Sequence, residues 1–182
     1  MDLLILILFT IVVLICGIIA FYTFIYNKFQ DTIIRISEVE ATIDSNLRQK
    51  YDLINRSISI IKANVEVKSK VFDDIARLRS RKISNFDLDR KLVYACNEII
   101  SIKDEHKDDI NSDELKKIIK QLNEIDSKLE TFRDYYNSNI VKYNKMVKTF
   151  PTNIVALLCK YEDKLFFDMK NMTDDDVEDF KL

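Results

Sequence analysis

Residues 115–150 read LKKIIKQLNEIDSKLETFRDYYNSNIVKYNKMVKTF, and this stretch decides the fold. Alternating steps of three and four from its first residue select a series that holds a single amide among apolar and aromatic side chains. The series is Leu115, Ile118, Leu122, Ile125, Leu129, Phe132, Tyr136, Asn139, Tyr143, Met146 and Phe150. Such a stripe predicts a helix that buries one side against partner helices. The spacing therefore predicts an all-α bundle with long helices and coiled-coil-like packing.

The composition agrees with long helices that have few breaks. The 182 residues include one Gly and one Pro, and they leave room for one domain with accessories. The formal net charge of −2 does not create a positive electrostatic field that would attract nucleic acid, so no nucleic-acid partner is predicted. The chain has an odd number of cysteines, and they lie far apart in the sequence: Cys16, Cys96 and Cys159. This fits a reducing compartment better than a disulfide framework.

The residues that metal and cofactor chemistry needs are scarce in this chain. His106 is the sole histidine, which makes a zinc site of Cys and His ligands or a His-based triad improbable. The Glu-x-x-His spacing of carboxylate-bridged metal sites is absent, and Gly17 alone cannot make a phosphate loop. We expect no catalytic residues, no metal and no cofactor. A carboxylate enzyme stays a distant alternative, because Asp and Glu here mostly take solvent-facing helical positions.

The first part of the chain is predicted to be a membrane anchor at residues 1–27. Leu3 to Tyr26 carry no formal charge, and as a helix they would extend roughly 36 Å against about 30 Å of hydrocarbon. Aromatic residues gather at the C-terminal end of the run, as in an interfacial belt. A cleaved signal peptide is the competing interpretation, but the chain starts Met1, Asp2 and contains no Ala-x-Ala site. Lys28 and Arg35 follow the span, so the rest of the chain is expected in the cytoplasm.

The remaining chain is predicted to form a helical domain at 28–168 and an acidic, disordered tail at 169–182. The expected helices cover about 28–82, 86–108, 113–150 and 152–168. A second seam runs through the first of them, with one extra step of four between Leu47 and Tyr51. Its apolar members are Phe29, Ile33, Ile36, Ile43, Leu47, Tyr51, Ile54, Ile58, Ile61, Val65, Phe72 and Ile75. Docking of the tail to a basic partner is the alternative to a solvated tail.

Helix boundaries are predicted by capping residues. Ser84 with Asp87 resembles a capping box, and Asn111 with Glu114 is a second such signal. Pro151 suits the first turn of a new helix. The basic residues at 77–82 can complement the dipole at a helix C-terminus, or they can form a patch for anionic lipid or nucleic acid.

Two Tyr-Asn pairs give the chain a family resemblance. Tyr136 and Asn137 recur as Tyr143 and Asn144, with Arg133 before them and Phe150, Pro151 and Ile-Val-Ala after them. This pattern resembles the signature of the LemA family of bacterial membrane-anchored proteins.

The first half of the chain agrees with this resemblance. Arg48 and Lys50, ahead of Asp52, are similar to an Arg-Arg-x-Asp-Leu-Ile segment of that family, and Arg79 closes the same helix. The pair Tyr26 and Asn27 falls at the expected membrane exit.

Three residues depart from the family pattern. Asn55 stands where the family usually has Pro, Lys68 where it has Glu, and Lys160 where it has Gly. The missing Pro removes an expected kink from the first long helix.

The resemblance implies an antiparallel four-helix bundle behind a single span and no known catalytic activity. A family relative shapes magnetosome membranes, and members are often encoded near membrane proteases. We therefore expect a scaffold or adaptor in the cell membrane that contacts the membrane and other membrane proteins. The alternative is a signalling or regulatory subunit in which the continuous helix transmits a change across the membrane.

Three expectations concern particular contacts. The Tyr-Asn pairs are predicted to serve packing and interhelical hydrogen bonding, with a binding site as the alternative. Arg133 needs a carboxylate or carbonyl partner, and Asp52 or its neighbours are expected to supply it. The stripe from Phe29 to Leu47 extends beyond the reach of the expected second helix. We expect a second copy of the chain to cover it, or else the helix at 152–168 or the lipid surface.

Overall fold

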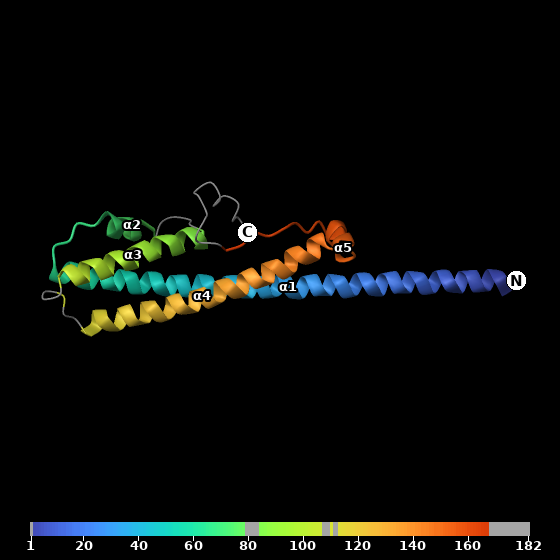
Figure 1. Ribbon diagram of the computed structural model, residues 1–182, viewed down its shortest axis with the longest axis horizontal. Helices are drawn as coiled ribbons and strands as arrows, with labels where there is room; N and C mark the ends of the chain where they lie inside the picture. Colours follow the sequence, from blue (N-terminus) through green and yellow to red (C-terminus); the bar gives the residue numbers. More distant parts are fainter. Residues whose placement is uncertain (1, 79–83, 107–109, 111–112, 168–182) are drawn as a thin grey trace. The chain divides into compact units, whose positions relative to one another are not determined.

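A computed structural model describes residues 2–78, 84–106, 110 and 113–167 of the chain. Every regular element in these ranges is a helix, so the predicted all-α class is confirmed (Figure 1). The elements are α1 (Asp2–Asn64), α2 (Lys70–Leu78), α3 (Asn85–Glu105), α4 (Asp113–Lys148) and α5 (Thr152–Cys159). The acidic run expected to form a tail lies outside the described residues.

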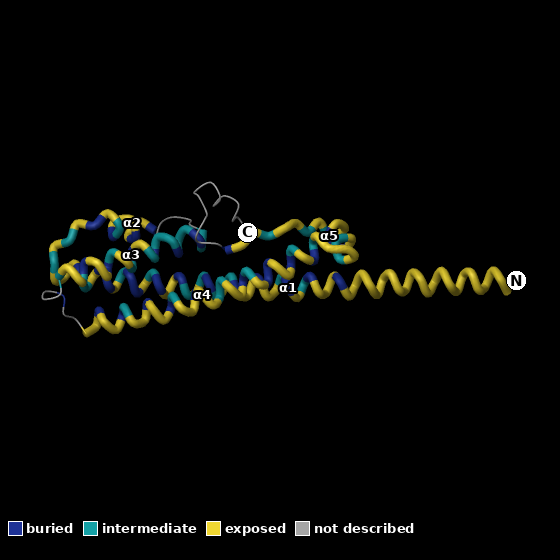
Figure 2. The backbone as a smooth tube through the Cα atoms, viewed as in Figure 1, coloured by how far each residue is buried: buried dark blue, intermediate teal, exposed yellow. Residues whose placement is uncertain are grey.

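The N-terminal part of α1 is the apolar stretch that the sequence predicts. Among the described residues, α1 alone is long and apolar enough to cross a membrane, and its most apolar window is not buried by any other part of the chain. Figure 2 shows this part of α1 exposed along its whole length, whereas buried residues appear at regular intervals after Ile25.

The chain divides into two compact units, and α1 and α4 contribute residues to both. The first unit is Met1–Glu38 with Asn137–Lys164, and the second is Val39–Tyr136 with Leu165–Leu182. Each unit therefore contains a part of α1 and a part of α4. The first unit also contains α5, and the second also contains α2 and α3.

The seam of residues 115–150 is confirmed for most of its length. Its buried members are Leu115, Ile118, Leu122, Ile125, Leu129, Tyr136, Asn139, Tyr143 and Met146. Phe132 is half-buried. Phe150 is 75% exposed, because α4 ends at Lys148 and the helical period no longer applies to it.

The predicted helix at 28–82 is wrong in one respect, because α1 stops at Asn64 and residues 65–69 are not helical. Val65 and Val67 are β-branched residues that weaken a helix locally. The break also has a tertiary cause: it lets α2 pack on α3 and bury Phe72, Ile75 and Leu78. Ser69 holds the turn through a hydrogen bond of 2.8 Å from its Oγ to Oε1 of Glu98 on α3.

The capping signal at Ser84 is confirmed. The side-chain oxygen of Ser84 accepts a hydrogen bond of 3.1 Å from the backbone N–H of Asp87, and α3 begins at Asn85. A helix also starts at Asp113 as expected, but Asn111 lies outside the described residues. Likewise, a new helix begins directly after Pro151.

The predicted helix at 152–168 is too long, because α5 ends at Cys159. Lys160 adopts the left-handed conformation with φ 55° and ψ 41°. The backbone N–H of Tyr161 donates to the carbonyl of Ala156 at 2.9 Å, and that of Lys160 donates to Leu157 at 3.3 Å. These two bonds form a Schellman motif, which ends a helix and normally has Gly at the left-handed position. The family resemblance leads us to expect Gly at position 160, so this departure falls on the residue that ends the helix.

Replacing Lys160 by Gly should stabilise the protein. A side chain in the left-handed region costs free energy that Gly avoids, and we expect Lys160→Gly to raise the free energy of unfolding by about 0.5–1 kcal/mol. Thermal unfolding of the full chain in detergent micelles, followed by circular dichroism, measures this. Lys145→Gly on the exposed face of α4 is the control and should instead destabilise. A Lys160→Gly protein less stable than the wild type would contradict the assigned conformation.

Candidate functional site

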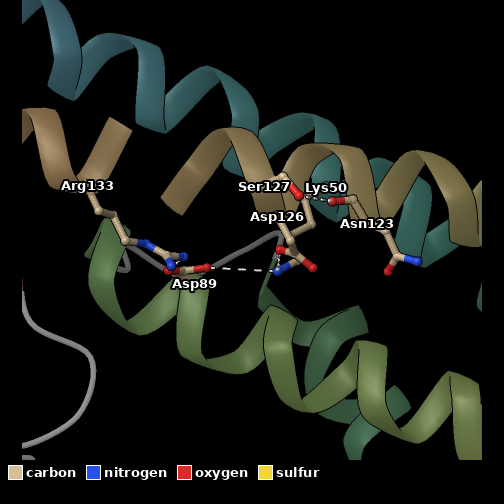
Figure 3. Close-up of polar contacts among 6 residues, drawn as sticks. All are labelled: Lys50, Asp89, Asn123, Asp126, Ser127 and Arg133. Atoms are coloured by element: carbon tan, nitrogen blue, oxygen red, sulfur yellow. Dashed lines mark hydrogen bonds and ion pairs between the residues drawn. The ribbon is translucent and has the colours of Figure 1, made fainter. Parts of the chain in front are cut away.

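Four charged side chains from three helices meet in the second unit and form what we call the buried ion cluster. Its members are Lys50 of α1, Asp89 of α3, and Asp126 and Arg133 of α4 (Figure 3). Arg133 donates through Nη2 to Oδ2 of Asp89, and Lys50 donates through Nζ to Oδ1 of Asp126. The Nζ of Lys50 also lies 3.9 Å from Oδ1 of Asp89, so Asp89 connects both cations.

Helical spacing explains why these residues face inward. Lys50 lies three residues after buried Leu47 and four before buried Ile54, which puts it on the same face of α1. Asp89 likewise lies midway between Phe86 and Leu92, both buried on α3. A charge in such a position must be paired, because an isolated buried ion costs several kcal/mol.

Burial dominates the electrostatics of Asp89. Removal from water raises the pKa of this carboxyl above its usual range, although the charges of Arg133 and Lys50 act in the opposite direction. The side chains of Lys50 and Asp89 are fully buried, whereas that of Asp126 is 42% exposed. The cluster is thus closed to solvent on the Asp89 side and open at Asp126.

This geometry favours a structural role over a chemical one. The two cations and two carboxylates balance, and both fully buried members are held by partners within the cluster. Solvent reaches the side chain of Asp126, which is 42% exposed, and part of the side chain of Arg133, which is 19% exposed. Within the part of the chain that the structure describes, no group of three or more His, Cys, Asp or Glu residues is placed to hold a metal ion.

Aromatic residues cover the Arg133 end of the cluster. The guanidinium carbon of Arg133 lies 5.6 Å from the ring centroid of Phe167, within cation–π range. The Phe167 ring also packs edge-on against Phe86 at 5.9 Å and Tyr136 at 6.3 Å. Tyr136 is buried, and burial together with the neighbouring Glu40 carboxylate raises the pKa of its phenol. The first Tyr of the Tyr-Asn pattern therefore belongs to the core beside the cluster.

The second Tyr-Asn pair holds the segment that follows α5 in the first unit. Asn144 donates from Nδ2 to the carbonyl of Lys164 at 2.7 Å and accepts at Oδ1 from the backbone N–H of Lys164 at 2.8 Å. Tyr143 packs edge-on against Phe29 of α1 with ring centroids 5.8 Å apart. The second pair thus makes an aromatic packing contact with α1 and hydrogen bonds to a non-helical segment, whereas the hydrogen bonds predicted for the motif run between helices.

The other motif residues have diverse environments. Asn137 is half-buried, whereas Phe150 and Pro151 are exposed, and Arg79 lies outside the described residues. Arg48 is exposed and pairs with Asp44 one turn earlier at 2.8 Å. Exposed pairs of this kind contribute little to stability.

The predicted contact between Arg133 and Asp52 is wrong. Asp52 is exposed on α1, and the carboxylate that pairs with Arg133 is Asp89 of α3. The physical reason is register: Lys50, not Asp52, points from α1 toward α3 and α4. The expectation that Arg133 has a carboxylate partner is nevertheless confirmed.

The stripe proposed for pairing with a second copy is not available. Phe29, Ile36, Ile43 and Leu47 are buried within the chain, and Ile33 is half-buried. Within the first unit, the Phe29 ring packs against Tyr143 of α4 and against Tyr161, which follows α5. The cover over Phe29 thus comes from the same chain, but from α4 and the segment after α5 and not from a helix that continues to residue 168.

Sequence reasoning missed three members of the cluster as site residues, Lys50, Asp89 and Asp126. For two of them the signal was present, because they occupy apolar-series positions of their helices: Lys50 at three residues from Leu47, and Asp89 at three from Leu92. The predicted seam of the first long helix instead steps by four from Leu47 to Tyr51, which is only half-buried. A charged residue at a seam position was the feature that marked the site.

A comparison with family models matches the LemA family over residues 39–179, more than half of the chain. The chain belongs to the LemA family. The match includes every member of the buried ion cluster and both Tyr-Asn pairs, but begins after Tyr26 and Asn27. A search of curated proteins finds no match to this sequence.

In this LemA-family chain the thiol of Cys96 lies close enough to the cluster to sense its charges. Burial raises the pKa of Cys96 to about 11 from an ordinary value of 9.0, and the carboxylates of Asp126 and Asp89 act in the same direction while Lys50 opposes them. Because the pKa of the buried thiol is about two units above its ordinary value, the thiolate fraction at pH 8 is roughly a hundredfold lower. We therefore expect Cys96 to react with iodoacetamide at least that much more slowly in the native protein than in denaturant, as measured by mass spectrometry. Equal rates in the two states would contradict the burial of this thiol.

Proposed function

We propose that this protein is a membrane-anchored scaffold or adaptor of LemA type, without catalytic activity, that organises other membrane proteins or membrane structure. The observation that carries the proposal is the continuity of α1, which runs without interruption from its exposed apolar stretch at the N-terminus to Asn64. One helix thereby joins an anchor to a folded domain. The LemA membership and the charge-balanced cluster, in which Lys50 and Asp89 are fully buried, support a structural role.

We infer further that the domain is an antiparallel four-helix bundle. Contacts between α1 and α4 in the second unit run in opposite order along the two helices: Arg56 pairs with Glu114 at 3.0 Å, and Lys50 pairs with Asp126. Residue numbers fall on α1 as they rise on α4, which supports antiparallel packing. The positive residues Lys28 and Arg35 after the apolar stretch support a cytoplasmic domain.

Affinity purification of the intact protein from detergent-solubilised membranes tests the scaffold proposal. We expect a reproducible set of membrane proteins to copurify with the wild type. Asp52→Ala, an exposed position on α1, should retain that set, whereas Asp89→Ala should lose it because the domain that presents the binding surface is destabilised. Copurification that is equal for both variants, or turnover of a substrate by purified protein in a broad activity screen, would contradict the proposal.

A second candidate function is signalling or regulation through α1. The favouring observation is that α1 has no break between Tyr26 and Ile43, so a rotation or tilt of the anchor could reach the domain through a continuous rod. Insertion of two glycines after Ser37 should abolish signalling and leave simple scaffolding nearly intact. Copurification of partners with this insertion variant, measured together with the cellular response they control, separates the two functions.

A further inference from the structure

The surface of α5 is unusually apolar for a part of a folded domain. Its sequence, TNIVALLC, holds no charged residue, and only Val155 and Ala156 are buried. Leu157 is 80% exposed and Leu158 is 67% exposed, and Phe150 and Ile154 are exposed beside them. Figure 2 shows α5 largely exposed. An apolar cluster of this kind marks an interaction surface.

Three contacts within the first unit fix the position of α5 along α1. At the end of α5, Sγ of Cys159 lies 3.5 Å from the hydroxyl of Tyr22. In the turn that follows, Tyr161 accepts a hydrogen bond of 2.7 Å from Nε2 of Gln30, and its ring packs on Phe29 with centroids 4.9 Å apart. The C-terminal end of α5 therefore lies between the levels of Tyr22 and Gln30.

That position coincides with the end of the apolar stretch of α1. Tyr22 is four residues inside the uncharged run that ends at Tyr26, which corresponds to about 6 Å along the helix axis. Tyr22 and Tyr26 stack with ring centroids 6.1 Å apart, as residues of an interfacial aromatic belt would. If the stretch spans a bilayer, the exposed leucines of α5 lie at the level where headgroups meet acyl chains.

We propose that α5 is an interfacial membrane helix that inserts Leu157, Leu158 and their apolar neighbours into the bilayer that α1 crosses. The inference rests on the proposed membrane anchor. Interfacial helices bury an apolar face at the headgroup boundary and place cations beside it. Lys160 follows α5 directly and is exposed, which suits an ammonium group reaching lipid phosphates. We assign this apolar surface to the bilayer because Cys159, at the end of α5, contacts Tyr22, and Tyr22 lies inside the apolar stretch of α1.

Tryptophan provides a direct test, because the chain contains none and a single introduced Trp is the only one present. Leu157→Trp and Leu158→Trp would be prepared in the full-length protein and reconstituted into phosphatidylcholine vesicles, either unmodified or brominated on the acyl chains. Phe9→Trp, in the apolar stretch, is the control for the anchor. Tyr94→Trp, at an exposed position of α3, is the control for a site in water.

We expect a blue-shifted emission for at least one of the α5 variants and a loss of fluorescence in brominated vesicles close to that of Phe9→Trp. Tyr94→Trp should keep its fluorescence. Quenching of Phe9→Trp without quenching of either α5 variant would overturn this inference and leave the anchor intact. A blue shift without bromine quenching would show that protein, such as a second copy, covers α5, and would also overturn it. Absence of quenching at Phe9→Trp would overturn the anchor itself. Far-UV circular dichroism would verify that each variant is folded.

Discussion

Asp89→Ala should lower the free energy of unfolding by about 3–5 kcal/mol, the largest effect that we expect from a single charged residue in this protein. Asp89 is fully buried and contacts both Arg133 and Lys50. Its removal leaves Arg133 without its carboxylate and leaves Lys50 with Asp126 alone, so a cation remains in the interior uncompensated. Thermal unfolding of the full chain in detergent micelles, followed by circular dichroism, measures the loss.

Two comparisons separate this explanation from a general effect of mutation. Asp52→Ala removes an exposed carboxylate from α1 and should change stability by less than about 0.5 kcal/mol. A combined Lys50→Met, Asp89→Leu and Arg133→Met variant removes three of the four charges and leaves Asp126, which is 42% exposed and can be solvated. It should be more stable than Asp89→Ala, since no unpaired ion remains fully buried. If the combined variant were the less stable of the two, the cost would come from lost packing and the assigned role of the ion pairs would be wrong.

Phe29→Ala should destabilise the first unit by about 3–5 kcal/mol. The side chain is fully buried, and its ring contacts Tyr143 of α4 and Tyr161 after α5. A cavity at this position removes the common contact of the two tyrosines, so the segment from Tyr143 to Lys164 should open locally. Amide hydrogen exchange on the protein in nanodiscs measures this, and a loss of about 3 kcal/mol corresponds to roughly a hundredfold faster exchange of protected amides.

Ile34→Ala is the matched control, because Ile34 is exposed on the same helix. This variant should leave exchange between Tyr143 and Lys164 unchanged. If instead Phe29→Ala changed the apparent oligomeric state and left these amides protected, Phe29 would be covered by another copy of the chain. That result would contradict the intramolecular packing.

Much of the fold could be read from local patterns, because a helix places residues three and four apart on one face. The period of residues 115–150 correctly identified nine buried positions of α4, including Tyr136 and Tyr143. The cap at Ser84 was predictable for the same reason, since its partner Asp87 is three residues away. The Tyr-Asn pattern likewise indicated the LemA family that the comparison shows.

The candidate site could be predicted less completely from such local patterns. The period could place Arg133 near a seam and predict that it needs a carboxylate, but it could not choose between Asp52 and Asp89. That choice depends on which face of α1 and α3 meets α4, and no local spacing contains this information. Asn144 is similar, because its partner is the backbone of Lys164, a segment that sequence reasoning assigned to a helix.

The sequence by itself therefore determined the helical class, the apolar N-terminal stretch, most buried positions of α4 and the family. The tertiary structure decided the burial of Lys50 with Asp89 and the cover over Phe29, and the packing of α2 on α3 turned the locally weak helix after Asn64 into a break. The physical reason is the range of the interactions. Periodicity and capping act over three or four residues, whereas Lys50 pairs with Asp126, which is 76 residues away in the chain. Whether a seam position buries a charge or an apolar group, and which helix covers it, is settled when such distant segments pack together.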